Sequence, residues 1–375
     1  MNRKKYLLLG GTGAMGRNLT SILARTSSEI YVTSRSNRKD TCSNIHYIQG
    51  DAKDLLFLKK LLQDHTYDAV IDFMVYSTEE FRERVQLLLD AARQYVFLSS
   101  SRVYAASAEP LRETSARLLD VSEDRKYLAT DEYALTKARQ EDILRDSGKR
   151  NWTVIRPYIT FDDYRLQLGV MEKELWLQRA LSGRKILFSK DIAVHMTTLT
   201  WGFDVARGIT SILGRSAAMG EIFHIAASES HTWSEILKVY LEELEKFSGK
   251  RPEIVLADHS PLLSVSEYQI RYDRYFDRRF DNSKILAFMH GESFSPPLEC
   301  LRKSIRNFLQ SPRFLFLNVK REALFDRITG DHMRKSELSS GKEYILYCLY
   351  RYFGEYITEK MILRLAALLR RLKHA

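Results

Sequence analysis

Short apolar runs alternate with amphipathic segments along the first third of the chain. Apolar strands separated by helices are typical of a parallel sheet that is covered on both faces. The pattern therefore predicts an α/β fold built on a doubly wound parallel sheet. The predicted strands cover residues 6–9, 29–34, 45–49, 69–74, 95–98 and 152–155, and helices between them include 55–62 and 81–92.

The pattern changes after Pro157, where longer helical segments replace the alternation. Further helices are expected over 166–181, 204–213, 234–247 and 298–309, with one strand over 221–225. We therefore divide the chain into three parts. These are a sheet domain over 1–163 to which parts of 196–228 return, a smaller lobe over 164–310, and a basic helical C-terminal extension over 311–375.

The extension begins near Pro312, and its helices are expected near 342–353 and 356–372. The last of these is amphipathic, because apolar residues follow one side and cations flank them. Such terminal helices more often pack on their own protein or on a partner, and peripheral contact with an anionic membrane is the less favoured alternative. The apolar side holds Ile357, Met361, Leu365, Leu368, Leu369 and Leu372, and the cations are Lys360, Arg364, Arg370, Arg371 and Lys373.

The first strand runs directly into a glycine-rich turn, Gly10-Gly11-Thr12-Gly13-Ala14-Met15-Gly16. The spacing fits G-x-G-x-x-G from Gly11, and an amphipathic segment follows. Such glycines permit a tight turn, a close approach of the backbone to a pyrophosphate, and packing of the helix on the strand. The N–H groups at the helix N-terminus would hold the pyrophosphate. We therefore expect a dinucleotide cofactor at this turn.

Tyr133 and Lys137 form a second candidate site. They are four residues apart in a helical segment, so their Cβ atoms lie on one face, about 5–6 Å apart. A neighbouring ammonium would lower the pKa of Tyr133, whose hydroxyl could then exchange a proton while hydride moves at an adjacent carbon. Ser100 follows the strand over 95–98, and its hydroxyl could align a substrate oxygen with Tyr133.

Composition adds only broad limits. The chain has 375 residues, of which 45% are hydrophobic and 28% charged, as in ordinary globular proteins. The three cysteines are far apart, and neither they nor the histidines show metal-ligand spacing, so we expect no metal and a reducing, cytoplasmic setting. We expect no signal peptide and no membrane span.

The net charge is +10, and much of the excess lies late in the chain. Such a balance is compatible with a phosphorylated ligand, a nucleic acid or an anionic membrane. It is also compatible with cations scattered over a solvated surface. We expect a phosphorylated substrate and no nucleic acid.

Four motifs taken in order resemble those of the extended short-chain dehydrogenases/reductases, the NAD-dependent epimerase/dehydratase group that modifies nucleotide sugars. They are GGTGAMG, SSSRVY, YALTK and Ile155-Arg156-Pro157. The resemblance implies a Rossmann fold, a nicotinamide cofactor, a nucleotide-sugar substrate and a homodimer. It also implies that Ser100, Tyr133 and Lys137 form the catalytic triad, with Tyr133 and Lys137 beside the cofactor.

The same resemblance implies further contacts. Asp51, with Ala52 beside it, matches an adenine-contacting position, and Phe73 ends the fourth strand where the family contacts its cofactor. Arg156 and Pro157 match cofactor-contacting positions after the sixth strand. Ser101 and Arg102 stand where the family's 4,6-dehydratases carry Asp-Glu, so that type of dehydration is disfavoured, and Ser101 is expected at the substrate.

The second strand ends in Ser34 and is followed by Arg35, with no carboxylate before Asp40. An acidic residue at this point binds the ribose hydroxyls of NAD, whereas an arginine can hold a 2′-phosphate with two hydrogen bonds. Ser34 and Arg35 therefore favour NADP over NAD, and NAD stays open.

The substrate's diphosphate needs cations from the lobe, and we expect Arg165 and Arg274 to supply them. Other candidates are Arg184, Lys185, Arg271, Arg278 and Arg279. The favoured function is a nucleotide-sugar epimerase that works by transient hydride abstraction through a keto intermediate. An NADPH-dependent reductase of a keto sugar is the alternative, followed by a non-catalytic binding protein, which the fold alone does not exclude.

Overall fold

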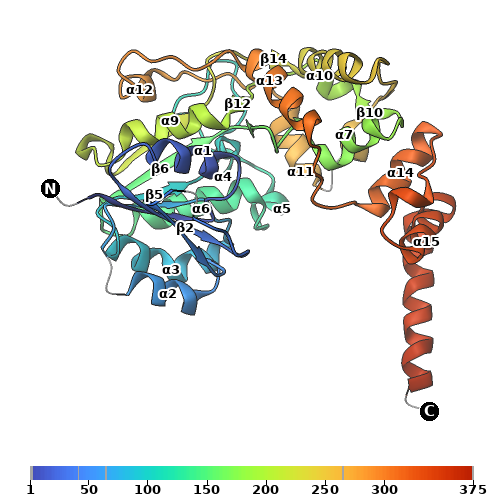
Figure 1. The fold of residues 1–375 in the computed structure, drawn as a ribbon, viewed down its shortest axis with the longest axis horizontal. Helices are drawn as coiled ribbons and strands as arrows, with labels where there is room; N and C mark the ends of the chain where they lie inside the picture. Colours follow the sequence, from blue (N-terminus) through green and yellow to red (C-terminus); the bar gives the residue numbers. More distant parts are fainter. Residues whose placement is uncertain (1–2, 41, 64–65, 264–265, 374–375) are drawn as a thin grey trace.

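A seven-stranded parallel sheet forms the centre of the protein (Figure 1). The computed structural model of the chain describes residues 3–40, 42–63, 66–263 and 266–373; the side chains of 261, 262 and 365–373 lie outside this description. The strand order is β13-β6-β5-β4-β1-β2-β3, so the predicted α/β fold is confirmed. The strands are β1 Lys5–Leu9, β2 Glu29–Ser34, β3 Ile45–Gln49, β4 Ala69–Asp72, β5 Tyr95–Leu98, β6 Trp152–Pro157 and β13 Glu221–Ile225.

Helices cover both faces of the sheet because its strands bury side chains on both sides. On β1, Leu8 packs in the core on one face of the sheet, whereas Leu7 and Leu9 pack in the core on the opposite face. The strand order reverses between β1 and β4, which is where open parallel sheets bind ligands, at the carboxyl ends of the strands. The first face carries α1 (Ala14–Leu23) and α9 (Gly202–Ile212), and the second carries α2 (Leu55–Leu62), α3 (Thr78–Asp90) and α6 (Tyr133–Arg145).

A smaller lobe packs beside the carboxyl ends of the strands. Its core joins large side chains from several helices, including Trp176, Tyr240 and Phe308. Its helices are α7 (Lys173–Leu181), α10 (Trp233–Ser248) and α13 (Pro297–Gln310), and β10 (Ile186–Ser189) pairs with β15 (Ile254–Ala257). Short strand pairs are β7 (Thr160–Phe161) with β12 (Thr200–Trp201) and β11 (Met196–Thr197) with β14 (His231–Thr232), and short helices are α4 (Leu118–Val121), α5 (Arg125–Leu128), α8 (Lys190–Ala193), α11 (Glu267–Gln269) and α12 (Ser283–Leu286).

One predicted helix is partly wrong. Residues 166–181 do not form a single helix, because β8 (Gln167–Leu168) and β9 (Met171–Glu172) make a hairpin before α7 begins at Lys173. The turn of this hairpin contains Gly169 with a φ of +60°, a left-handed conformation that favours glycine. Gly169 was the residue in the sequence that could have indicated this turn, but the helical spacing of the apolar residues led to the prediction of one helix.

The C-terminal extension is a helical unit attached to the lobe (Figure 1). It consists of α14 (Val319–Thr329) and α15 (Gly341–Lys373). The predicted break between two terminal helices corresponds to Gly354, whose φ of 77° and ψ of 176° interrupt α15. Helix α14 was not predicted, and its Phe325 is buried in the lobe's core. The extension is therefore anchored on the lobe at α14.

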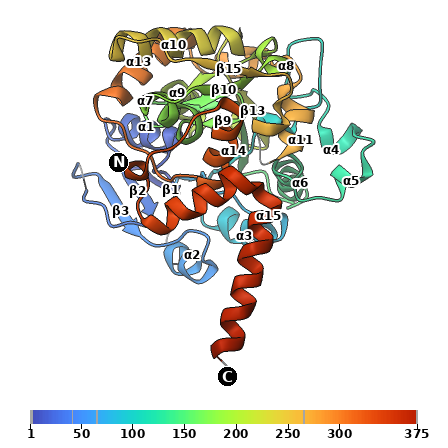
Figure 2. The same cartoon turned by 90° about the vertical axis from the view of Figure 1, so that its right-hand side faces the viewer.

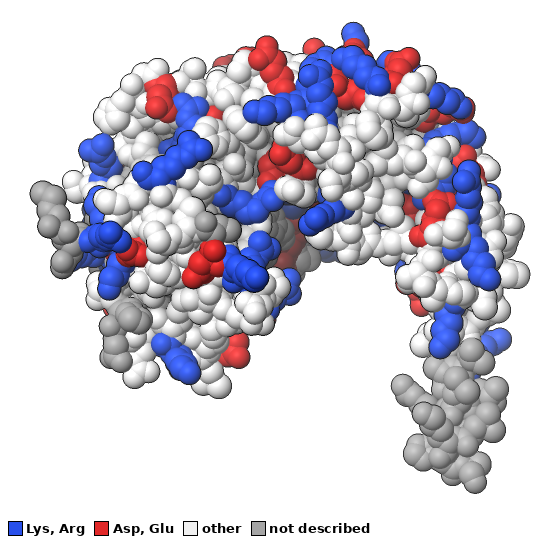
Figure 3. Space-filling model, in the orientation of Figure 1, with Lys and Arg blue, Asp and Glu red and all other residues white. Residues whose placement is uncertain are grey.

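Charge is spread over the face that Figure 3 shows, with Lys and Arg intermixed with Asp and Glu. On this face the cations are scattered over the surface, which is one of the alternatives that the sequence left open for the net positive charge. Within the described part of the chain, no helix combines the length and the apolar character that crossing a bilayer requires.

Candidate active site

The glycine turn is shaped for close approach by a ligand. Gly10 has a φ of +67°, and a Cβ on Gly16 would lie 2.5 Å from the backbone of Gly11, so strand and helix need glycine there to pack. A Cβ on Gly13, in contrast, would meet no atom within 4 Å. Gly13 caps α1 and supplies no side-chain acceptor to the helix's first N–H groups. These open donors beside free space fit a pyrophosphate.

Substituting Gly13 tests this fit. Because a methyl group at Gly13 has free space within the protein but enters the ligand's space, Gly13→Ala is expected to raise the Kd for NADH at least about tenfold. The melting temperature should fall by only a few degrees, since alanine is a somewhat poorer helix cap than glycine. Titration calorimetry and thermal unfolding check both quantities.

Gly16→Ala is the matched comparison for that variant. Its Cβ would collide with the Gly11 backbone, so it should lower stability as well as binding. Equal Kd values for Gly13→Ala and the unchanged protein would contradict a cofactor at this turn.

Two cavities meet beside the glycine turn. The smaller, of about 290 Å³, lies at the carboxyl end of β2, and the larger, of about 510 Å³, lies at the ends of β4, β5 and β6. Met74 lines both cavities and therefore stands between them. The predicted cofactor residues at the smaller cavity are Gly10, Thr12, Ser34, Arg35, Asp51 and Ala52, and those at the larger are Met15, Phe73, Tyr133, Lys137 and Pro157.

The larger cavity brings the three predicted triad residues together. Ser100 follows β5, whereas Tyr133 begins α6 and Lys137 stands one turn later on the same face. The Lys137 ammonium donates a hydrogen bond of 2.8 Å to the Leu98 carbonyl and lies 6.0 Å from the centre of the Tyr133 ring. The pair therefore shares one cavity, in which Tyr133 is partly exposed and Lys137 is buried.

The electrostatics differ from the expectation for Tyr133. Burial raises the pKa of its hydroxyl, and the Arg102 guanidinium and a hydrogen bond with Ser100 only partly oppose this increase. The expected lowering by Lys137 is therefore wrong for the protein alone. Arg102 lies 5.4 Å from the centre of the Tyr133 ring, so sequence reasoning missed the nearest cation, although it lies only two residues beyond Ser100.

Lys137 itself is perturbed because it is buried. Burial lowers the pKa of its ammonium to about 8, while the negative charges of Asp72 and Glu141 oppose this decrease. Asp72 is the last residue of β4, and burial raises its pKa to about 6. Its carboxylate accepts a 2.8 Å hydrogen bond from the Tyr95 hydroxyl. Glu141 was foreseeable, since it stands four residues after Lys137 on α6.

Arginines from three segments line the larger cavity, namely Arg102, Arg165 and Arg274. Arg102 donates to Glu132 at 2.5 Å, and Arg165 donates to Glu172 at 3.0 Å. Arg274 is 3% exposed and forms a close ion pair with Asp273, a carboxylate that it shares with Arg278. Burial and repulsion from Arg102 lower the pKa of Arg274. The charged side chains that line the cavity are four cations, Arg102, Lys137, Arg165 and Arg274, and one carboxylate, Glu172.

Several predicted residues lie elsewhere. The Arg156 guanidinium is buried against the Glu141 carboxylate at 2.6 Å, and the Ser101 hydroxyl donates to the Arg156 carbonyl at 2.8 Å. Neither side chain lines the two cavities. Arg184, a candidate for the diphosphate, instead forms a buried ion pair with Glu322 at 2.5 Å. Its role is to attach the extension.

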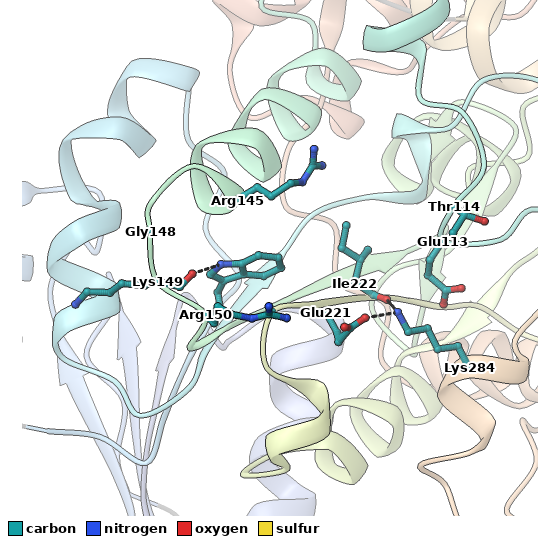
Figure 4. A pocket seen from close by; sticks show the side chains of 11 residues that line it. Glu113, Thr114, Arg145, Gly148, Lys149, Arg150, Glu221, Ile222 and Lys284 are labelled. Carbon is teal, nitrogen blue, oxygen red and sulfur yellow. Dashed lines mark hydrogen bonds and ion pairs between the residues drawn. The ribbon is translucent and has the colours of Figure 1, made fainter.

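A third cavity, of about 540 Å³, lies at the amino ends of β6 and β13, away from the carboxyl ends of the strands (Figure 4). Beside this cavity the Lys284 ammonium donates to the Glu221 carboxylate at 2.8 Å. It contains none of the predicted site residues. Because open parallel sheets bind ligands at the carboxyl ends of their strands, the cavity around Tyr133 is the candidate active site.

Comparison with known proteins gives a consistent picture. The model of the "NAD dependent epimerase/dehydratase family" matches residues 6–226. The chloroplast stem-loop binding protein of 41 kDa b of Arabidopsis thaliana is 25% identical over 274 residues, which are 69% of this chain and 67% of that protein. UDP-glucose 4-epimerase of Lactobacillus helveticus is 26% identical over 160 residues, which are 37% of this chain and 46% of that enzyme.

A solved structure shares the fold. UDP-glucuronic acid 4-epimerase from Bacillus cereus, in complex with UDP-glucuronic acid and NAD, superposes with a TM-score of 0.62. The match has 17% sequence identity and covers 82% of this chain and all of that one. At this identity the likeness concerns the fold alone.

Proposed function

This chain belongs to the NAD-dependent epimerase/dehydratase family, and we propose that it is an epimerase that inverts one carbon of a nucleotide sugar. One observation carries the proposal: Ser100, Tyr133 and Lys137 meet in a cavity at the carboxyl ends of the strands, beside a glycine turn at a helix N-terminus that its N-cap residue leaves without a side-chain cap. A nicotinamide cofactor bound there would take up and return a hydride. The triad and the proposed cofactor site therefore lie next to each other, as hydride transfer requires.

In the proposed mechanism, Tyr133 exchanges the proton. Its phenolate accepts the proton of the sugar hydroxyl as a keto intermediate forms, and the resulting phenol returns that proton after the sugar has presented its other face. Ser100 holds the same sugar oxygen through its hydroxyl. The cationic groups Arg102 and Arg165 favour the phenolate, which removes the proton in the first step and forms again in the second.

The positive cavity supports an anionic substrate. Arg165 and Arg274 stand on the side of the cavity formed by the lobe, where guanidinium groups can bind phosphate oxygens with two hydrogen bonds. Arg165 also faces Tyr133, whose negative charge it would stabilise. We therefore propose that both arginines contact the diphosphate or an acidic sugar attached to it.

The proposed reaction is testable by its cofactor balance. UDP-glucose and UDP-glucuronic acid, each incubated with the protein and NAD, should give a mixture of two epimers without net change in absorbance at the NADH wavelength. Chromatography of the nucleotide sugars measures the conversion. Stoichiometric oxidation of NADPH with a keto sugar would instead support the reductase, and no conversion by a cofactor-bound protein would contradict both.

The choice between NAD and NADP depends on Arg35, which is exposed at the smaller cavity. We propose that its guanidinium binds the 2′-phosphate of NADP. Arg35→Ser should then weaken NADPH binding about tenfold, because hydrogen bonds to a charged group are worth roughly 1.5–3 kcal/mol, and change the Kd for NADH less than about twofold. Arg25→Ser, a change at an exposed arginine that lines neither of these two cavities, is the control. Equal losses for both cofactors would contradict a phosphate contact.

The relative named as a stem-loop binding protein favours a second candidate, a binding protein on the same fold. The two candidates differ in what Tyr133 does. An enzyme needs its hydroxyl, whereas RNA binding would depend on surface cations. Retention of a stem-loop RNA at physiological salt by the protein, together with no turnover of any nucleotide sugar, would favour this second candidate.

A further inference from the structure

The distal half of α15 extends away from the rest of the protein. The helix changes direction at Gly354, and from Glu355 to Lys373 it runs outward from the extension (Figures 1 and 2). We call residues 355–373 the distal helix. Its first turn contacts α14, whereas the views from two perpendicular directions agree that its far end has no other described element beside it. It is therefore available to something outside the chain.

The distal helix exposes large apolar side chains. Tyr356 is 77% exposed and Leu363 is 70% exposed, and Ile357 and Met361 are each nearly half exposed. The sequence predicted that this helix packs on its own protein or on a partner, and these four apolar side chains are not buried against the chain itself. The sequence continues the apolar spacing with Leu365, Leu368, Leu369 and Leu372, whose side chains lie outside the described residues.

Charge separates along the same helix. Its two carboxylates, Glu355 and Glu359, form ion pairs with Lys320 on α14 at 2.7 Å and 3.4 Å, so they are turned back toward the extension and partly neutralised. The Tyr350 hydroxyl also donates to Glu359 at 2.9 Å. Beyond them, residues 360–375 contain five Lys or Arg and no Asp or Glu. The outer part of the helix is thus purely cationic as well as apolar.

We propose that the distal helix binds the surface of an anionic lipid membrane. An amphipathic helix with cations beside a leucine-rich face lies in the plane of the membrane surface, with its apolar side inserted below the headgroups and its cations on the lipid phosphates. Pairing with a second copy of the chain would place five cations against five, which charge repulsion opposes. An anionic membrane surface can bind both the apolar side chains and the cations of the distal helix.

Vesicle binding by the full-length protein tests the proposal. Vesicles of phosphatidylcholine with 30% phosphatidylglycerol (about one lipid in three) should sediment the protein at low salt, whereas pure phosphatidylcholine should not. About 0.5 M NaCl should release most of it, because salt screens the attraction. Lys360→Glu combined with Arg364→Glu should lower the partition coefficient about thirty-fold or more, since each cation near such a surface contributes about fivefold.

A matched control makes the result specific. Lys59→Glu with Lys60→Glu makes the same change in net charge on α2, where both side chains are exposed, and should leave binding within about twofold. Ile357→Gln with Met361→Gln should reduce binding about tenfold through the apolar face. Circular dichroism confirms that each variant is folded.

Three results would overturn the proposal. The first is equal binding to both kinds of vesicle, and the second is equal loss in the α2 control and the distal-helix variant. The third is a dimer, detected by light scattering, that Ile357→Gln with Met361→Gln dissociates while vesicles bind nothing. That result would assign the apolar face to a second copy.

Discussion

Tyr133→Phe is expected to reduce turnover of the nucleotide sugar by about 10²–10⁴-fold, the usual contribution of a positioned acid–base group. The change removes one oxygen atom and leaves the aromatic ring, so the contact between the ring and Arg102 persists. Binding of NADH should therefore stay within about twofold. Chromatographic assay of the epimers measures the rate, and calorimetry measures cofactor binding.

The control for that variant is Tyr164→Phe. Tyr164 is about half exposed and does not line the cavity, so loss of its hydroxyl should leave turnover unchanged. If Tyr133→Phe kept full activity while binding cofactor, the proposed proton exchange would be excluded. If both variants lost activity equally, the effect would come from instability and not from chemistry.

Arg179→Met is expected to cause the largest loss of stability, about 3–5 kcal/mol, because it removes one of the two arginines that neutralise the buried carboxylates Glu322 and Asp326. Arg179 is fully buried on α7 and donates to Glu322 at 2.8 Å and to Asp326 at 2.7 Å, both on α14. Burial raises the pKa of Glu322, which shows how poorly that site tolerates an unpaired charge. The denaturant midpoint and proteolytic cleavage near residues 311–318 measure the effect.

An exposed ion pair provides the comparison. Arg251 pairs with Glu245 at 3.0 Å, and both side chains are about half exposed, so Arg251→Met should change stability by less than about 1 kcal/mol. Combining Arg179→Met with Glu322→Gln should recover part of the loss, since it removes one buried charge. Equal midpoints for Arg179→Met and Arg251→Met would show that the buried network does not hold the extension in place.

The sequence was informative where a short pattern fixes the local structure. Apolar runs predicted the central strands, with boundaries displaced by at most a few residues at β4 and β6, because a strand buried on both faces must be apolar throughout. The four-residue spacing of Tyr133 and Lys137 placed them together, since helix geometry alone decides which residues share a face. The glycine turn was predictable because only glycine tolerates its conformation at Gly10 and its close approach at Gly16.

The tertiary structure decided which distant residues meet. Arg102 reaches the Tyr133 ring and the charge of Asp72 acts on Lys137 only because β4, β5 and α6 pack together, and no periodicity in the chain encodes that arrangement. The attachment of Arg184 to Glu322 spans 138 residues, so a cation that suited a substrate phosphate by composition was used to hold α14. The local pattern of apolar and polar residues determines which side chains of an element are buried. The partner of a buried charge depends instead on how separate elements pack against one another. For this reason the sequence alone was sufficient to predict the sheet, the glycine turn and the tyrosine–lysine pair. The tertiary structure determined which charged groups surround that pair.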